Sequence, residues 1–191
     1  MSNVTLDDPK APQPAQTRPL RATPSVAHRV AEPSLVTYMP DNSAPSSFSR
    51  VMNLMGGSKV LKTAPTSRAD VHELIQTGLP TRSVSALVAG ALLLKSEQML
   101  DAIGISLRTF QRFKVEPGGT LSREQSDRAW RLSELLVKAI ELFGSKEEAE
   151  RWFDTPAPAL DRRRPIELMT SSVGARMVEQ LLGRIEYGVY T

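Results

Sequence analysis

Five polar side chains lie close together between residues 108 and 114, and their chemistry suits the edges and phosphates of double-stranded DNA. They are Arg108, Thr109, Gln111, Arg112 and Lys114. Arginine can bond guanine through two hydrogen bonds, glutamine can bond adenine in the same way, and lysine suits a phosphate. A solvated basic helix surface is the alternative interpretation. The residue types favour a surface that enters the major groove.

The surrounding residues 95–114, KSEQMLDAIGISLRTFQRFK, predict the two helices that would position these side chains. A helix-turn-helix needs a short helix, a tight turn and a second helix at a steep angle to the first. Gly104 suits the turn because glycine tolerates positive φ, and Ser106 suits the N-cap of the second helix. The residues expected to pack the two helices together are Met99, Ile103, Ile105, Phe110 and Phe113.

Two features modify this pattern. Leu100 stands where a small alanine is common, which predicts looser or shifted packing between the two helices. Three arginines near the start of the next helix are expected to widen the basic surface, namely Arg123, Arg128 and Arg131.

Residues that could support catalysis do not gather into a site. The chain has no cysteine, which excludes disulfides and thiol chemistry. His28 and His72 lack the spacing of metal ligands, and the two Gly-Gly pairs lack the Lys-Ser/Thr of a phosphate loop. The basic run DRRR at 161–164 is expected either to bind a phosphate or an acidic patch, or to be a solvated loop. We expect no enzymatic activity, no cofactor and no metal.

Composition limits the class of protein further. The 191 residues carry a formal net charge of +3 and a pI of about 9.4, which permits nucleic-acid binding without requiring it. Residues 1–45 hold eight of the fourteen prolines and no glycine, a composition that predicts a disordered tail. The longest apolar stretch, Val84 to Leu94, is too short to span a bilayer. We expect a cytoplasmic protein.

From Phe48 onward the apolar residues repeat at helical spacing, and no segment shows the alternation of a strand. We therefore predict an all-α protein, with a tail at 1–45, a helix-turn-helix domain at 46–121, and a C-terminal domain at 122–191 that begins with a long linking helix. Outside the helix-turn-helix, the predicted helices lie at about 48–57, 67–78, 83–94, 122–144, 145–153 and 171–187. In the last helix, one apolar stripe is assigned to the core: Val173, Met177, Leu181 and Ile185.

The C-terminus, LLGRIEYGVYT, places Tyr187 and Tyr190 within five residues of the end. Chain ends usually carry small or polar residues, so two aromatic rings here need a reason. The first interpretation is that another protein receives them. The second is that Tyr187 folds back over Trp152 or Phe153.

Five segments together resemble the Xre/MbcA/ParS-type antitoxins, which are partners of RES-domain toxins in bacterial toxin–antitoxin operons. In chain order they are TGLPTRSVSAL, IGISLRTFQRFK, LSREQSDRAWRLSELLVKAIELFGSKEEAERWF, TPAPAL and RPIELMTSSVGARMVEQLLGRIEYGVYT. The resemblance covers about residues 48–191. Its most specific positions are Trp152, Pro156, Leu160, Pro165, Leu168, Thr170, Gly174 and the RIEYGVY ending.

The resemblance implies a two-part protein: an Xre-like domain that binds operator DNA, autorepresses and forms a homodimer, and a C-terminal module that binds the toxin. RES toxins resemble ADP-ribosyltransferases that degrade NAD, and antitoxins of this family block the toxin's active site. The segment implied to contact the toxin consists of Arg184, Glu186, Tyr187, Gly188, Val189, Tyr190 and Thr191. Within it, we expect Gly188 to end the helix in a left-handed turn.

Other functions remain open at this point. One is a stand-alone helix-turn-helix transcriptional regulator whose C-terminal module dimerises or senses an effector. Another is a member that holds the toxin but no longer reads DNA.

Overall fold

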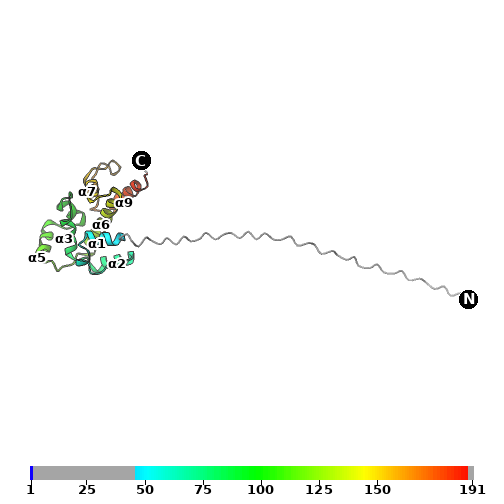
Figure 1. The fold of residues 1–191 in the computed structure, drawn as a ribbon, viewed down its shortest axis with the longest axis horizontal. Coiled ribbons are helices and arrows are strands. Elements are labelled where there is room, and N and C mark those ends of the chain that lie inside the picture. Colours follow the sequence, from blue (N-terminus) through cyan, green and yellow to red (C-terminus); the bar gives the residue numbers. More distant parts are fainter. Residues whose placement is uncertain (2–45, 189–191) are drawn as a thin grey trace. The chain divides into compact units, whose positions relative to one another are not determined.

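The computed structural model describes Met1 and residues 46–188, and this part is all-helical, which confirms the predicted fold class (Figure 1). The predicted tail at 1–45, apart from Met1, lies outside the described residues, as do Val189, Tyr190 and Thr191. Between residues 46 and 188, β-structure is limited to the isolated bridges Pro80–Thr120 and Ala157–Arg163. The elements are α1 (Ser47–Leu54), η1 (Gly57–Lys59), α2 (Arg68–Thr77), α3 (Thr81–Ala89), α4 (Ser96–Ile103), α5 (Leu107–Val115), α6 (Arg123–Phe143), α7 (Lys146–Asp154), η2 (Pro158–Leu160), α8 (Pro165–Leu168) and α9 (Ser172–Glu186).

Serine side chains set where most of the longer helices begin. In each case the serine hydroxyl accepts the N–H three residues ahead, which satisfies one of the free donors of the first turn. At Ser67 and Ser122 the bond is reciprocated, by Asp70 and Gln125 respectively. The serine N-caps of the described helices are Ser46, Ser67, Ser106, Ser122, Ser145 and Ser171.

Helix α6 is the shared centre of the core. It packs against α1, α2 and α4 on the N-terminal side of the chain and against α7 and α9 on the C-terminal side. Ala129, Leu132 and Ala139 on this helix are completely buried. Burying a leucine side chain contributes about 1.5–3 kcal/mol, so a helix with buried residues toward both halves ties them into one core.

The segment before α4 corrects one sequence prediction. A helix was expected over 83–94, but α3 ends at Ala89, and Leu92 and Leu93 are 61% and 43% exposed. The physical reason lies in Glu150 of α7, whose Oε2 accepts the backbone N–H groups of Leu92, Leu93 and Leu94 at 2.7, 2.6 and 3.1 Å. A continuing helix would have used those N–H groups for its own carbonyls.

Glu150 is itself buried, with 1% of its side chain exposed. Lys146, one turn earlier, places its Nζ 3.8 Å from Glu150 Oε1 and also donates to the carbonyl of Gly90 at 2.5 Å. The carboxylate is therefore surrounded by donors from the loop and by one cation. A buried charge is tolerated only with such partners.

We predict that Glu150→Ala lowers the free energy of unfolding by about 3–5 kcal/mol, because it leaves three loop N–H groups without their acceptor. Glu147→Ala is the matched control, since Glu147 lies on the same helix in an exposed pair with Arg151. Its loss should stay below about 1 kcal/mol. Urea unfolding followed by circular dichroism measures both. Equal losses in the two variants would contradict the role given to Glu150.

A second carboxylate, Asp70, stabilises the start of α2 from the surface. It accepts the Thr66 N–H and hydroxyl, both at 2.8 Å, and the Ser67 N–H at 3.0 Å. These bonds, with the Thr66 N–H as the largest cause, lower the pKa of Asp70 from 3.8 to about 2. Because the folded pKa lies below the unfolded one, the stabilisation is complete above about pH 4 and disappears as the pH falls towards 2.

Asp70→Asn should therefore remove a pH-dependent part of the stability. We expect the difference in unfolding midpoint between wild type and variant to be constant above pH 5 and to shrink as the pH falls below 4. Urea titrations at a series of pH values between 7 and 2.5 measure it. A difference that does not change with pH means that the carboxylate's charge plays no part in capping α2.

Candidate functional site

Helices α4 and α5 form the predicted helix-turn-helix. Gly104 between them has φ +79°, and a Cβ at this position would lie 2.8 Å from Arg128 Nη1. Ser106 then caps α5 by accepting the Thr109 N–H at 3.1 Å. The turn thus depends on glycine for its backbone angle and for the close approach of Arg128.

The residues expected to join the two helices do so. Met99, Ile103, Ile105 and Phe110 are at most 4% exposed, and Phe113 is half-buried against the same core. Leu100 is also buried, at 1%, so the larger side chain at this position is accommodated inside the fold.

Three of the five proposed DNA-contacting residues project from one exposed face of α5. These are Arg108, Gln111 and Arg112. The other two lie at its flanks: the Thr109 hydroxyl is 2.9 Å from the Ser106 hydroxyl, and Lys114 Nζ lies 5.1 Å from the centre of the Phe110 ring. The structure therefore brings the set onto one helix surface but separates it into a central group and two edges.

The same outward face carries two apolar residues that the sequence analysis missed. Leu107 is 46% exposed and Val115 is 80% exposed. Together with Gln111 they are spaced four residues apart, which places them near one line of the helix. The four-residue spacing of Leu107 and Val115 from Gln111 is the sequence signal that places these two apolar residues on the same face.

The three arginines expected to widen the basic surface are engaged within the chain. Arg128 pairs with Glu124 at 2.5 Å and lies over the α4–α5 turn. Arg131 pairs with Asp127, and Arg123 Nε donates to the Gln76 carbonyl at 3.2 Å. Of these three, Arg128 is the one that borders the helix-turn-helix.

The apolar stripe of α9 that was expected to lie in the core is not the buried face of this helix. Ala175, Val178 and Leu182 are the buried residues, whereas Val173 is 60% exposed. Met177, Leu181 and Ile185 are half-buried, so the stripe given to the core lies along its margin. The cause is Gly174: a Cβ there would lie 2.2 Å from the Leu168 carbonyl oxygen, and this close approach to α8 fixes which face of α9 turns inward.

The residues implied to contact a toxin lie on two different sides of the C-terminal end of α9. Glu186 forms an ion pair with Lys138 of α6, with 3.1 Å between Lys138 Nζ and Glu186 Oε2, on the side of the helix that faces the core. Arg184 is exposed on the outward side, and Tyr187, the C-cap, is 81% exposed. Gly188 has φ +67°, the left-handed conformation expected for it.

Tyr187 does not fold over Trp152 or Phe153. The Trp152 ring instead contacts Phe143 and Phe153, with ring centroids 5.6 and 5.3 Å apart. Tyr187 and Arg184 belong to a row of exposed residues at spacings of three and four, which places them on one side of α9. We call this row the outer stripe of α9: Val173, Arg176, Gln180, Arg184 and Tyr187.

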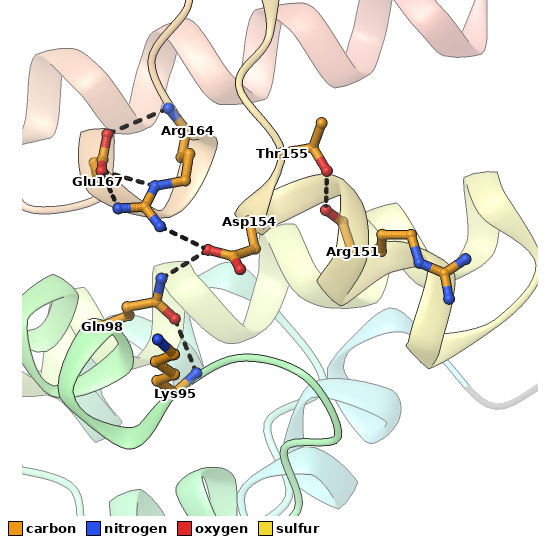
Figure 2. Close-up of polar contacts among 7 residues, drawn as sticks. All are labelled: Lys95, Gln98, Arg151, Asp154, Thr155, Arg164 and Glu167. Carbon is orange, nitrogen blue, oxygen red and sulfur yellow. Dashed lines mark hydrogen bonds and ion pairs between the residues drawn. The ribbon is translucent and has the colours of Figure 1, made fainter.

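A chain of polar contacts joins the helix-turn-helix to the C-terminal helices (Figure 2). Gln98 of α4 donates to Asp154 Oδ1 at 2.7 Å, and Arg164 donates to the same oxygen at 3.2 Å. Arg164 also donates to Glu167 at 2.8 and 2.5 Å, which lowers the pKa of Glu167 and raises that of Arg164. Within the basic run, Arg162 and Arg163 remain exposed while Arg164 is held by these carboxylates.

Comparison with known proteins decides the family. Residues 70–134 match the antitoxin Xre-like helix-turn-helix domain, and residues 138–188 match the antitoxin Xre/MbcA/ParS C-terminal toxin-binding domain. An antitoxin Xre from Yersinia enterocolitica is 33% identical over 129 residues, which cover 66% of this chain and 86% of that protein. The chain belongs to the Xre/MbcA/ParS-type antitoxins.

Other relatives agree with this assignment. An antitoxin Xre from Photorhabdus laumondii is 27% identical over 125 residues, or 65% of this chain and 83% of its own. A protein of Sphingobium sp. described as Prs ADP-ribosylating antitoxin is 25% identical over 138 residues, or 68% and 84%. The antitoxin therefore has a helix-turn-helix region that contains α4 and α5, and a toxin-binding domain that contains α7 to α9.

Among residues 46–188, no group of three or more His, Asp or Glu is arranged to hold a metal ion. None of the helices in that range is both long and apolar enough to cross a membrane.

Proposed function

We propose that this antitoxin neutralises an NAD-degrading RES toxin by placing its C-terminal segment in the toxin's active site, and that it represses its own operon by binding operator DNA as a homodimer in the cytoplasm. In this proposal residues 46–121 bind DNA, residues 122–191 bind the toxin, and the antitoxin has no catalytic activity of its own. The observation that carries the proposal is the exposed Tyr187, beside Arg184, at the end of a helix whose other face is buried.

The chemistry of this helix end suits a site that normally receives a dinucleotide. A tyrosine ring offers a flat apolar face with a polar tip, and few of its torsions must be ordered on binding. Arg184 supplies a guanidinium that can pair with a carboxylate of the toxin. Val189, Tyr190 and Thr191 follow directly after the left-handed turn at Gly188 and would extend this contact.

Glu186 has a different role in the proposal. Its carboxylate is already paired with Lys138 on the core side of α9. We therefore assign it to fixing the end of the helix, while Arg184 and Tyr187 make the contact with the toxin.

An NAD-degrading partner is supported by the resemblance to partners of RES toxins and is compatible with one relative's name. ADP-ribosylation draws its ADP-ribose from NAD, and the Sphingobium protein is described as an ADP-ribosylating antitoxin.

A chain that ends at Glu186 should fold like wild type but fail to stop NAD consumption by the RES toxin that the proposal places in its operon. Tyr187 is 81% exposed, so its removal takes little from the core. Glu186→Gln in the full-length chain is the control and should still neutralise. The readout is NAD loss over time with antitoxin in excess. Full protection by the shortened chain would show that the C-terminal segment is dispensable.

The DNA-binding part of the proposal rests on the exposed face of α5. Arg108 and Gln111 lie near the N-terminal end of the second helix, which is the end that reaches base edges in helix-turn-helix proteins. Arg112 lies one turn after Arg108 on the same face, and Lys114 lies nearer the other end, where phosphates are the closer partners. Two such helices in a homodimer would require two half-sites about one helical turn apart.

Arg108→Ala combined with Arg112→Ala should weaken binding to the DNA upstream of the antitoxin gene by about 2–6 kcal/mol, at one to three per contact. The matched control is Arg162→Ala with Arg163→Ala, which removes the same charge from an exposed loop of the C-terminal domain. Gel-shift titrations at fixed salt compare the two. If both pairs lose affinity equally, overall charge rather than α5 is responsible.

A further inference from the structure

Leu107 is an exposed apolar residue beside the polar side chains of the outward face of α5. It is the first residue of α5, directly after the Ser106 N-cap, and 46% of it is exposed. Phe110 and Phe113 supply the contacts of α5 with the core, and Leu107, three residues before Phe110, lies at the border of that side without being part of the core. Nearly half of the leucine side chain is therefore left outside the core packing of α5.

The neighbouring polar groups at this end of α5 are occupied with each other. The Ser106 hydroxyl accepts the Thr109 N–H at 3.1 Å and lies 2.9 Å from the Thr109 hydroxyl. Thr109 is also half-buried at the edge of the helix. Leu107 and Arg108 are then the side chains that project from the first turn.

The major groove contains one apolar group, the 5-methyl of thymine, and apolar side chains recognise it by contact. The first turn of the second helix is the part that approaches base edges. We propose that Leu107 contacts a thymine methyl group and makes operator recognition depend on thymine at that position. This inference rests on the proposed binding of operator DNA by α5.

Val115 provides an internal comparison. It is also aliphatic and is 80% exposed, but it lies eight residues further along α5, about 12 Å at the helical rise. A residue at that end of the helix is carried away from the base edges. The proposal therefore assigns thymine dependence to Leu107 and none to Val115.

The test uses the full-length protein and the DNA fragment upstream of its gene, prepared once with thymine and once with uracil in its place. This exchange removes the methyl groups and keeps every base pair. Burying one methyl contributes about 0.8 kcal/mol, so wild type should bind the thymine fragment roughly fourfold more tightly for each methyl contact. Leu107→Ala should lose this preference, whereas Val115→Ala should keep it.

The outcomes separate the inference from the function on which it rests. If wild type binds neither fragment, operator binding itself is wrong and the inference is overturned with it. If wild type binds both fragments equally, or if Leu107→Ala keeps the wild-type preference, operator binding stands and the inference about Leu107 is overturned. Because the wild-type comparison alone can overturn the inference, the test does not depend on how the variant folds.

Discussion

One buried carboxylate holds the DNA-facing and toxin-facing parts of this antitoxin in a fixed relation. Glu150 of α7 accepts three consecutive backbone N–H groups from the loop that leads into α4. Separating the loop from α7 would leave a buried charge without its donors, which costs several kcal/mol. The start of α4 is therefore tied to α7, and α5 follows α4 through the turn at Gly104.

Other contacts also join the helix-turn-helix region to the C-terminal helices. Helix α6 packs against α4 as well as α7 and α9, and the two matched family regions, 70–134 and 138–188, meet within it. The Gln98–Asp154–Arg164 contacts add a third connection on the surface (Figure 2). A displacement of α7 would break contacts at the start of α4. The helix-turn-helix region and the toxin-binding domain are therefore held in place by the same contacts.

Local sequence signals predicted much of this fold. Apolar residues at helical spacing located the helices, and Gly104 with Ser106 located the helix-turn-helix, because these signals act within one or two turns of the chain. The boundary of α3 could not be predicted in this way, since the acceptor that ends it, Glu150, lies 56 to 58 residues away. The inward face of α9 depended likewise on the contact of Gly174 with Leu168, which the helical spacing alone does not specify.

The candidate binding residues show the same contrast between what local sequence signals predict and what depends on contacts distant in the chain. Residue types and the family resemblance predicted that α5 and the C-terminal segment bind partners. Only the packing separates Arg184 and Tyr187 from Glu186, or places Leu107 among the outward residues. The buried face of α9 is shifted by one residue from the expected stripe. Because of this shift, the outer stripe of α9 is exposed. The surface that we propose to face the toxin is thus a consequence of how α8 meets α9.

Binding of a non-hydrolysable NAD analogue to the toxin, measured by calorimetry with and without saturating antitoxin, tests most directly whether the C-terminal segment occupies the active site. We expect the toxin alone to bind the analogue and the toxin–antitoxin complex to bind none, because ligand and segment would need the same space. A complex that binds the analogue with the affinity of the free toxin would contradict this account.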